Sequence, residues 1–478
     1  MTILVTGATG YIGGRLATRL LARGHRVRAM ARDSRRCAAL TAAGAECVTG
    51  DALQTESLVS ALQDVAVAYY LIHSMGSGPD FAQRDREAAG NFAAACAAAG
   101  VRRIIYLGGL GQPGPALSKH LASRQEAGDV LRAGPVPVTE LRAAIIVGAG
   151  SASFEIIRDL ARKLPVMICP RWVRSRCEPI ALDQVLEYLI GVLDEVRTVG
   201  EVLEIGGGEV LTYEEMMRQC AAALGKRVRI VVIPVLTPRL SSYWLNLVTS
   251  VPMGIARPLA EGLRNDVVTT DHRIREWIPL PPVTFRQAVD RALTEDRAGP
   301  LATRWTGATG ARPVDPLGRR GAILRDERVL RANTSPAALF AAVERLGGAT
   351  GWYYADRLWR LRGLLDRLVG GVGMRRGRRD PLAIALGDPI DFWRVEEFLP
   401  GRLLRLHAEM KVPGAATLEF EVGAAPDGSG AVLRQRAEFE PHGAAGRIYW
   451  DALRPLHALV FRGLAAGIVR AAEARTRS

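Results

Sequence analysis

The sequence predicts a doubly wound parallel α/β domain followed by a smaller α+β domain, and three observations carry this prediction. From residue 2 to residue 142, short β-branched runs alternate with longer stretches of helical periodicity, as in a parallel sheet covered by helices on both faces. Three glycines, Gly7, Gly10 and Gly13, lie between the first such run and the first helical stretch. Near the C-terminus the pattern changes to apolar–polar alternation, which is typical of antiparallel strands with one buried face.

The first domain is expected to alternate strands and helices in chain order. Strands are expected at residues 3–6, 27–31, 46–49, 67–72, 103–107 and 138–141, and helices are expected to start near Tyr11, Arg35, Thr55, Phe81 and Leu117. Residues 151–297 continue as mixed α/β, with a strand at 201–208 running into a turn. Thr212 is expected to cap the next helix, with Glu215 as its capping-box partner. This region is expected to form the substrate side of the same unit.

The second domain follows a predicted linker. Residues 297–322 are dense in Gly, Pro, Thr and Arg and lack periodicity, which predicts domains at 1–296 and 323–478. Apolar and polar residues alternate at 404–412, 418–422 and 433–439, so half-buried antiparallel strands are expected there, with a turn at 427–430. A long terminal helix is expected from an apolar stripe with spacing of three or four, made by Tyr449, Leu453, Leu456, Val460, Leu464 and Ile468.

Composition narrows the classes of function. The 478 residues are 48% hydrophobic and 23% charged, so we expect two or three folded domains. The net charge of +14 would suit nucleic acid. However, only four of the 63 basic residues are lysines, and the arginines are spread along the chain apart from a short cluster at 375–379. We therefore expect a charged loop at this cluster and no nucleic-acid binding.

The sequence has neither a secretory signal nor cysteines at metal-ligand spacing, and these two features predict its localisation and metal content. Six cysteines lie in the first half without Cys-x-x-Cys or zinc-ligand spacing, so reduced thiols and no metal site are expected. The first strand begins at Thr2, which leaves no room for a secretory signal and predicts a cytoplasmic protein. Residues 240–256 carry no charge, and their length is near the lower limit of about 17 residues for a spanning helix. They are expected to line a substrate region, with peripheral contact to a membrane as the alternative.

The glycine triplet is the strongest motif. It follows a strand and opens a helix, which is the context that the dinucleotide-binding Rossmann fingerprint requires. Gly7 permits the tight turn, Gly10 lets backbone amides approach the pyrophosphate, and Gly13 lets the helix pack close to the strand. The pyrophosphate would then lie at a helix N-terminus, which favours an anion. We expect the cofactor to contact Gly7, Thr9, Gly10, Tyr11, Ile12 and Gly13.

Residues after the second strand favour NADP(H) over NAD(H). An NAD site places an acid there to hold the ribose hydroxyl, whereas an NADP site places arginine. Here Arg32 ends the strand and Arg36 follows within one turn, and a guanidinium suits the 2′-phosphate. Asp33 lies next to Arg32, so NAD(H) stays the alternative. Asp51, after the third strand, is positioned either to contact the adenine or to cap the following helix.

On these residues, 1–295 resemble the atypical short-chain dehydrogenase/reductase superfamily, particularly its NAD(P)-binding group related to nitrogen-metabolite-repressor proteins and the accessory NADH-dehydrogenase subunit. The resemblance rests on residues 6–13, Asp51, Asn91 and residues 139–142. Residues 323–473 resemble a domain of uncharacterised function often fused to such units. That domain has the helix-grip outline of lipid-transfer and polyketide-cyclase proteins, and the resemblance implies a cavity for an apolar ligand.

The catalytic pattern of the superfamily is broken in this chain. Active members carry a serine after the fifth strand and Tyr-x-x-x-Lys on the next helix, where the lysine lowers the pKa of the catalytic tyrosine. Residues 107–111 contain no serine, and the four-residue spacing is occupied by His120 and Arg124. His120 is a candidate for proton transfer and Arg124 for holding cofactor hydroxyls; the alternative is a solvated helix face. His73, after the fourth strand, is a third candidate because strand ends line the cofactor crevice, with a loop histidine bonded to a polar partner as its alternative.

Two functions fit these observations. The first is an NADP(H)-dependent oxidoreductase with a degenerate Ser/Tyr/Lys pattern, acting on an apolar carbonyl, enone or quinone-like substrate. The second is a non-catalytic NADP(H)-responsive binding or regulatory module with a lipid-like ligand in its C-terminal domain. The missing Ser and Tyr favour the second, whereas the phosphate loop is required by both. The substrate and the oligomeric state are not predicted by the sequence.

Overall fold

The computed structural model describes residues 1–74, 80–112, 114, 117–233, 251, 253–298, 303, 323–369, 371–375, 378, 384 and 386–476. Internal contacts divide the chain into two compact units, residues 1–309 and 310–478. Each unit has a hydrophobic core of its own, as expected for a chain of this length. The domain boundaries at 296 and 323 stay a prediction, since most of the linker at 297–322 lies outside the described residues.

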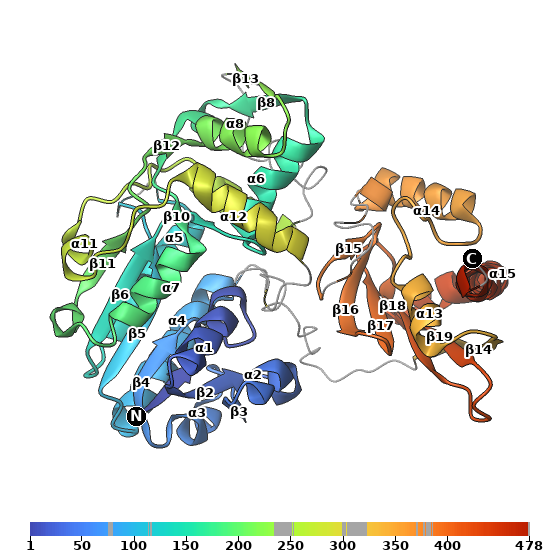
Figure 1. The fold of residues 1–478 in the computed structure, drawn as a ribbon, viewed down its shortest axis with the longest axis horizontal. Helices are drawn as coiled ribbons and strands as arrows, with labels where there is room; N and C mark the ends of the chain where they lie inside the picture. The colour runs from blue at the N-terminus through green and yellow to red at the C-terminus, as the bar shows by residue number, and fades with distance from the viewer. Residues whose placement is uncertain are drawn as a thin grey trace. The chain divides into compact units, whose positions relative to one another are not determined.

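In the described part of the first unit, a parallel sheet of seven strands forms the centre (Figure 1). Its strands are β1 (Thr2–Val5), β2 (Arg26–Ala31), β3 (Glu46–Thr49), β4 (Val65–Tyr70), β5 (Arg103–Gly109), β6 (Val138–Ala143) and β11 (Val202–Ile205). They lie in the order β11-β6-β5-β4-β1-β2-β3, and all neighbours are parallel. The strand order therefore reverses between β1 and β4, with β2 and β3 added on one side of β1 and the later strands on the other. Sheets of this topology bind nucleotides in the crevice at that point. The predicted doubly wound fold is confirmed.

Helices cover both faces of this sheet (Figure 1). They are α1 (Tyr11–Ala22), α2 (Ala38–Ala42), α3 (Thr55–Leu62), α4 (Phe81–Ala98), α5 (Lys119–Arg132) and α7 (Leu182–Gly191). Helices α1, α2 and α7 bury their apolar side chains in one core, and α3, α4 and α5 bury theirs in another. Because both faces are covered, the central strands β1 and β4 are almost entirely apolar rather than alternating.

Three of the predicted helix starts are confirmed and three boundaries are corrected. Helices α1, α3 and α4 begin at the expected residues, whereas α5 begins two residues late because Ser118 caps it, accepting from the Leu121 amide at 3.3 Å. The helix expected near Arg35 is a short 3₁₀ turn, Ser34–Cys37, that leads into α2. Strand β4 ends at Tyr70, not at residue 72, because the Leu71 amide donates to Thr6 Oγ1 at 3.0 Å.

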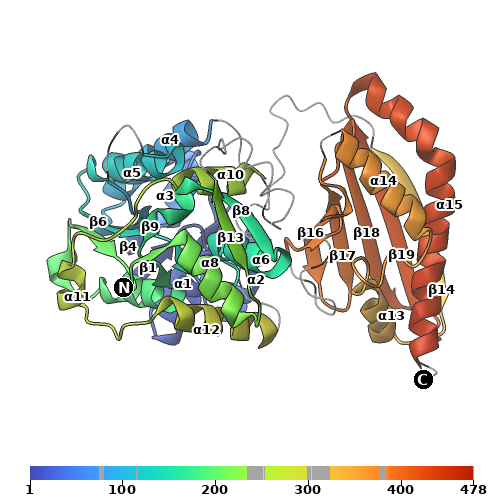
Figure 2. The same ribbon diagram turned by 90° about the horizontal axis from the view of Figure 1, so that it is seen from above.

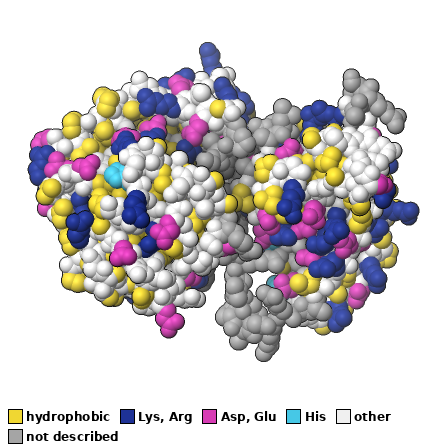
Figure 3. Space-filling view, turned by 60° about the horizontal axis from the view of Figure 1, so that its bottom comes forward, with side chains coloured by type: hydrophobic (Ala, Val, Ile, Leu, Met, Phe, Trp, Pro, Cys, Tyr) yellow, Lys and Arg dark blue, Asp and Glu magenta, His cyan; other side chains and the backbone are white. Residues whose placement is uncertain are grey.

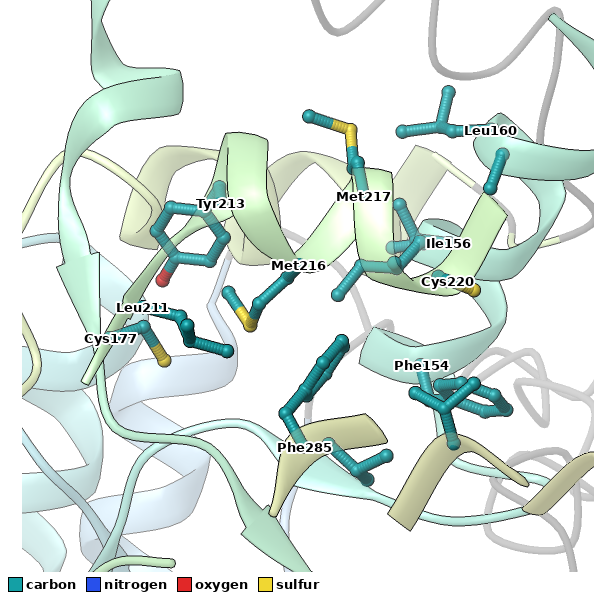
Figure 4. Packing of buried hydrophobic residues seen from close by; sticks show 14 of the residues in the cluster. Phe154, Ile156, Leu160, Cys177, Leu211, Tyr213, Met216, Met217, Cys220 and Phe285 are labelled. Carbon is teal, nitrogen blue, oxygen red and sulfur yellow. The ribbon is translucent and has the colours of Figure 1, made fainter. Parts of the chain in front are cut away.

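A smaller lobe follows the carboxyl ends of β6 and β11. Its main elements are α6 (Ala152–Lys163), β8 (Val166–Pro170), α8 (Tyr213–Ala223), β13 (Arg229–Ile233), α10 (Met253–Gly262) and α12 (Phe285–Ala298). Phe154, Met216 and Phe285 lie at the centre of its core (Figure 4). The predicted capping box is confirmed, since the Glu215 amide donates to Thr212 Oγ1 and the Thr212 amide donates to Glu215. Most of the apolar stretch 240–256 lies outside the described residues, although Val251 is buried in this core.

The described part of the second unit is an antiparallel six-stranded sheet with three helices (Figure 2). The strands are β14 (Leu324–Ala332), β15 (Pro389–Ile390), β16 (Trp393–Leu399), β17 (Leu403–Ala408), β18 (Gly414–Ala424) and β19 (Ala431–Pro441), and the helices are α13 (Pro336–Val343), α14 (Asp356–Leu368) and α15 (Gly443–Thr476). The order β14-β19-β18-β17-β16-β15 pairs the first strand with the last. The three predicted strands and the terminal helix are confirmed, except that the first strand ends at Ala408. The helix-grip outline stays a prediction.

Helix α15 belongs to the core of the second unit. By length and composition alone, it is the one helix in the described part of the chain that could cross a membrane. Its Val460, Leu464 and Ile468 are buried against the sheet, and the core helix of a globular domain passes the same test. Leu456, expected in the buried stripe, is instead exposed. The cytoplasmic localisation stays a prediction.

One histidine of α15 couples the stability of the second unit to pH. The His457 ring stacks on Phe461 and contacts Trp450. Burial, aided by the charge of Arg362, lowers its pKa from 6.5 to about 4. Between these values the unfolded chain binds a proton that the folded chain does not, so the free energy of unfolding decreases as the pH falls from 6.5 toward 4.

We expect His457→Phe to remove this loss, which amounts to about 2 to 3 kcal/mol over two pH units. The measurement is denaturant unfolding of the native and variant chains at neutral pH and near the folded pKa. His442→Phe, at an exposed position of the same unit, is the control. An identical pH dependence in the native chain and the His457 variant would show that this histidine does not cause it.

Candidate cofactor and active site

The phosphate loop connects β1 to α1, and its glycines are required by close contacts. Gly7 adopts a left-handed φ of +61°, and a Cβ there would lie 2.7 Å from the Leu71 carbonyl oxygen. A Cβ on Gly13 would lie 2.8 Å from the carbonyl carbon of Gly7, which is backbone and cannot move aside. The Gly10 amide donates to the Gly7 carbonyl at 2.8 Å, which closes the turn. These contacts fit the mechanical roles predicted for Gly7 and Gly13.

The loop presents the N-terminus of α1 to the crevice. Gly10 is the N-cap of this helix and offers no capping side chain, so the first amides of the helix can bind an anion. Thr9, Tyr11 and Ile12 are half-buried beside it. The Tyr11 hydroxyl is buried without a hydrogen-bond partner in the described part of the chain, and burial raises its pKa. The loop therefore fits the pyrophosphate of a dinucleotide.

Two arginines lie together where the 2′-phosphate of NADP would be expected. Arg32 is exposed directly after β2, and Arg36 is half-buried in the following turn. Burial and then the charge of Arg32 lower the pKa of Arg36, so the two guanidiniums repel each other. A bound phosphate would relieve that repulsion.

Asp51 has a local structural role. Its Oδ1 accepts from the Leu53 amide at 3.1 Å, and its carbonyl accepts from Ser57 Oγ at 3.0 Å. These bonds shape the turn before α3, which favours a structural role for Asp51 at the start of this helix over contact with the adenine. Asp51 is not the capping residue itself, since the N-cap of α3 is Gln54. Contact of Asp51 with the adenine stays a prediction.

His73 follows β4 and is held by a buried carboxylate. Its Nδ1 lies 3.0 Å from Oδ2 of Asp85, a residue of α4 that is 4% exposed, and the Ser74 amide donates to Asp85 Oδ1 at 2.8 Å. Burial opposes the charge of Asp85, but the bonds from His73 and Ser74 keep its pKa below the usual value. Burial also lowers the pKa of His73. A neutral imidazole beside a carboxylate donates from Nδ1, which leaves Nε2 as an acceptor.

His120 and Arg124 lie one turn apart on α5 and meet His73. The His120 and His73 ring centroids are 5.1 Å apart. Burial, then the charges of His73 and Arg124, hold the pKa of His120 well below 6.5. Nε2 of His73 and Nδ1 of His120 are both buried without a hydrogen-bond partner among the described residues. Buried polar atoms of this kind require an explanation, and a bound substrate or cofactor would supply the missing partner.

Arg124 joins the ends of two strands. Its guanidinium donates to the carbonyl of Ile72 after β4 (3.4 Å) and to that of Leu107 in β5, and it lies 4.9 Å from the centre of the Tyr106 ring. The alternative of a solvated helix face is therefore wrong for His120 and Arg124. The hydrogen bonds of Arg124 go to backbone carbonyls, so its predicted contact with cofactor hydroxyls stays a prediction.

The structure adds two residues to the site that the sequence did not predict. Asp85 orients His73, and Ser123 Oγ lies 3.4 Å from Asp85 Oδ2. Asp85 faces inward from α4 between exposed Arg84 and Arg86, so it resembles an ordinary surface acid in sequence.

The phosphate loop and the histidines are linked through Leu71, which contacts Gly7 and lies two residues before His73. In the described part of the chain, no cluster of three or more His, Cys, Asp or Glu could hold a metal.

Comparison with protein families identifies a cofactor-binding region. Residues 7–158 match a family described as NAD(P)H-binding, and residues 319–464 match the DUF2867 family of proteins of unknown function. The chain is 44% identical to sterol demethylase protein B of Methylococcus capsulatus over 70 residues, which are 15% of this chain and 21% of that protein. It is 28% identical to ceramide reductase of Caulobacter vibrioides over 240 residues, 48% of this chain and 73% of that protein.

Solved structures share the fold of the first unit. Triphenylmethane reductase of Citrobacter sp. matches with a TM-score of 0.51 and 21% identity, covering 62% of this chain and 100% of that one. The NADPH-dependent quinone oxidoreductase of Escherichia coli, solved with NADPH, matches with a TM-score of 0.50 and 21% identity over 61% and 100% of the two chains. At this identity the likeness concerns the fold.

Proposed function

Because its N-terminal region is an NAD(P)H-binding domain with a Rossmann fold, we propose that this chain is an NADP(H)-dependent reductase of an apolar carbonyl, enone or quinone-like substrate. The observation that carries the proposal is the meeting of His73, His120 and Arg124 at the carboxyl ends of β4 and β5. Catalytic groups of doubly wound enzymes lie in this crevice. Two of its buried imidazole nitrogens lack partners in the described part of the chain, as expected for a site that receives a ligand.

The chain's own groups would handle the proton in this reaction. When bound, the reduced nicotinamide supplies a hydride to the substrate. The neutral ring of His120 donates a hydrogen bond to the substrate oxygen and passes a proton to it, taking another from solvent at its second nitrogen. His73, with its tautomer fixed by Asp85, contacts the His120 ring and holds it in place. Burial lowers the pKa of both rings, so both are neutral at pH 7 and add no positive charge to the site.

An apolar substrate is favoured by the names of two matched relatives. They are a ceramide reductase and a sterol demethylase protein. These names support a lipid-like substrate for this chain, although only about a fifth of the second protein is covered.

Arg32 and Arg36 provide the test of cofactor choice. We expect R32A/R36A to weaken NADPH binding by about tenfold or more, because charge-assisted bonds to the 2′-phosphate are lost. NADH lacks that phosphate, so its affinity should change by less than about threefold. Fluorescence titration with both cofactors measures this, and Arg26→Ala, at the exposed start of β2, is the control. Equal losses for both cofactors would place the arginines outside the 2′-phosphate site.

The proposed reaction is tested on the full chain. NADPH and NADH are titrated by fluorescence, and oxidation of the reduced cofactor is then followed by absorbance with a panel of quinones, enones and ketones. Binding with oxidation supports the proposal. Binding without oxidation of any substrate would favour a regulatory module, and absence of binding to either cofactor would contradict both.

One observation favours a ligand-binding role for the second unit as a second candidate. The indole nitrogens of Trp359 and Trp393 and Nδ1 of His457 are buried without partners in the described part of the chain. A polar group of a bound lipid-like ligand would satisfy such atoms. Native mass spectrometry of the purified chain, followed by organic extraction, tests this role; a chain that carries no ligand and takes up none from a fatty-acid and sterol mixture would contradict it.

A further inference from the structure

Helix α14 of the second unit turns its leucines to solvent. Leu358, Leu361, Leu364, Leu365 and Leu368, here called the leucine face, are 37%, 51%, 50%, 54% and 76% exposed. Each of them lies three or four residues from another leucine of the set, so all five share one side of the helix. An ordinary surface helix buries such a stripe. Isolated exposed leucines need no explanation, but a contiguous apolar face does.

The buried side of α14 fixes this orientation. Trp359 packs in an aromatic cluster, 5.0 Å from Trp352 and 5.8 Å from Phe392 between ring centroids. Asp366 lies two helical turns after Trp359 and is also buried. Its carboxylate accepts hydrogen bonds from the amides of Gly373 and Lys411, both at 2.8 Å. Rotation of the helix to bury the leucine face would break both sets of contacts. The exposure of the leucines is thus a property of the packed domain.

The charges on the exposed side of α14 are all positive. Arg357, Arg360 and Arg367 are exposed, and none of them forms an ion pair with another residue that the structure describes. The two acids of the helix face inward: Asp366 as above, and Asp356 by accepting from the Trp352 amide at 2.8 Å. Positive charge beside an apolar face is complementary to a surface that combines acyl chains with anionic headgroups.

Elsewhere on the second unit, arginines are paired with acidic residues. On the sheet, Arg405 pairs with Glu419, and Arg436 bridges Glu419 and Glu327. Figure 3 shows basic and acidic side chains interspersed over the side of the second unit that it displays. Such a surface neutralises its own charge, whereas the exposed arginines of α14 have no acidic partner among the residues that the structure describes. A second copy of the helix would not supply them either, because symmetric pairing would bring arginines against arginines.

We propose that α14 docks the second unit on an anionic lipid surface, with the leucine face in the acyl boundary and Arg357, Arg360 and Arg367 at the level of the headgroups. The thirteen residues of the helix span about 20 Å, enough to lie along the interface. This role is independent of the proposed reductase activity and does not require α15 to leave its core. It would hold the chain where apolar substrates are dissolved.

Flotation of the full chain with lipid vesicles tests the proposal. We expect binding to vesicles of equal parts phosphatidylcholine and phosphatidylglycerol, and at least about tenfold weaker binding to phosphatidylcholine alone. L361Q/L365Q/L368Q should reduce binding to the anionic vesicles at least about tenfold, because the buried apolar area is lost. R357Q/R360Q/R367Q should do the same and should also remove most of the salt dependence.

Matched controls change equal numbers of exposed residues elsewhere. V59Q/V196Q/V210Q removes three exposed valines of the first unit, and R26Q/R84Q/R171Q removes three exposed arginines there; both should bind like the native chain. Circular dichroism checks that all variants are folded. Equal binding of the native chain to both vesicle types, or unchanged binding of the leucine variant, would overturn the proposal. So would a native dimer that the leucine variant converts to a monomer without any binding to vesicles.

Discussion

Replacing Gly13 by alanine is expected to weaken NADPH binding at least about 100-fold. The added Cβ would lie 2.8 Å from the carbonyl carbon of Gly7, so α1 and the loop cannot keep their present separation. The amides at the start of the helix would move away from the pyrophosphate, and two lost charge-assisted bonds account for a change of this size. Fluorescence titration of the purified variant with NADPH measures it.

The matched control is Gly90→Ala. This glycine lies within α4, and a Cβ there meets only Val130 Cγ1 at an ordinary 3.7 Å. Alanine is favoured over glycine in a helix by about 1 kcal/mol, so the control should be slightly more stable and bind NADPH like the native chain. A folded Gly13→Ala chain with native affinity would show that the cofactor does not bind at this loop.

Replacing His120 by phenylalanine is expected to lower kcat at least about 100-fold, the usual contribution of a positioned proton donor. Phenylalanine keeps the ring shape beside His73 but carries no nitrogen, so packing is preserved while proton transfer is lost. The affinity for NADPH should stay within about twofold of the native value, because the phosphate loop is unchanged. Steady-state kinetics with the best substrate of the panel, together with the cofactor titration, separate these effects.

The pH dependence provides a second readout. Burial places the pKa of both His73 and His120 below 6.5, so both rings are neutral at pH 7. The native rate should therefore stay nearly constant between pH 7 and the ordinary histidine range, and it should change only below that range, where the rings gain a proton. His442→Phe, at an exposed position of the second unit, is the control. An active His120→Phe chain with an unchanged rate would assign proton transfer to water or to another group.

The features that the sequence predicted well are those that depend on neighbours along the chain. The phosphate loop is read from glycine spacing between a strand and a helix, and the structure explains that spacing by backbone contacts between Gly7 and Gly13. The capping box depends on two residues of known chemistry three positions apart, Thr212 and Glu215. The positions of the central strands in the first unit follow from short apolar runs, as expected for a sheet that is covered on both sides.

The features that the sequence did not predict depend on contacts between segments that are distant along the chain. His73 and His120 were each proposed as candidates, but their meeting follows from the side-by-side pairing of β4 and β5. Asp85 carries no local signal, since the residues around it are those of an exposed helix face. In α14, the burial of Trp359 and Asp366 decides which side of the helix faces inward, and their partners lie at Phe392 and Lys411 in later strands or loops.

The sheet of the second unit is closed by strands from the two ends of its sequence, since β14 pairs with β19 from Leu324 beside Phe439 to Ala332 beside Ala431. The two strands are separated in sequence by all the other strands of the sheet and by helices α13 and α14. Bringing such distant segments together costs conformational entropy before any hydrogen bond is gained, and domains with many non-local contacts fold slowly. Until β19 is in place, β14 has no strand to pair with, so this edge of the sheet forms only once the last strand is available.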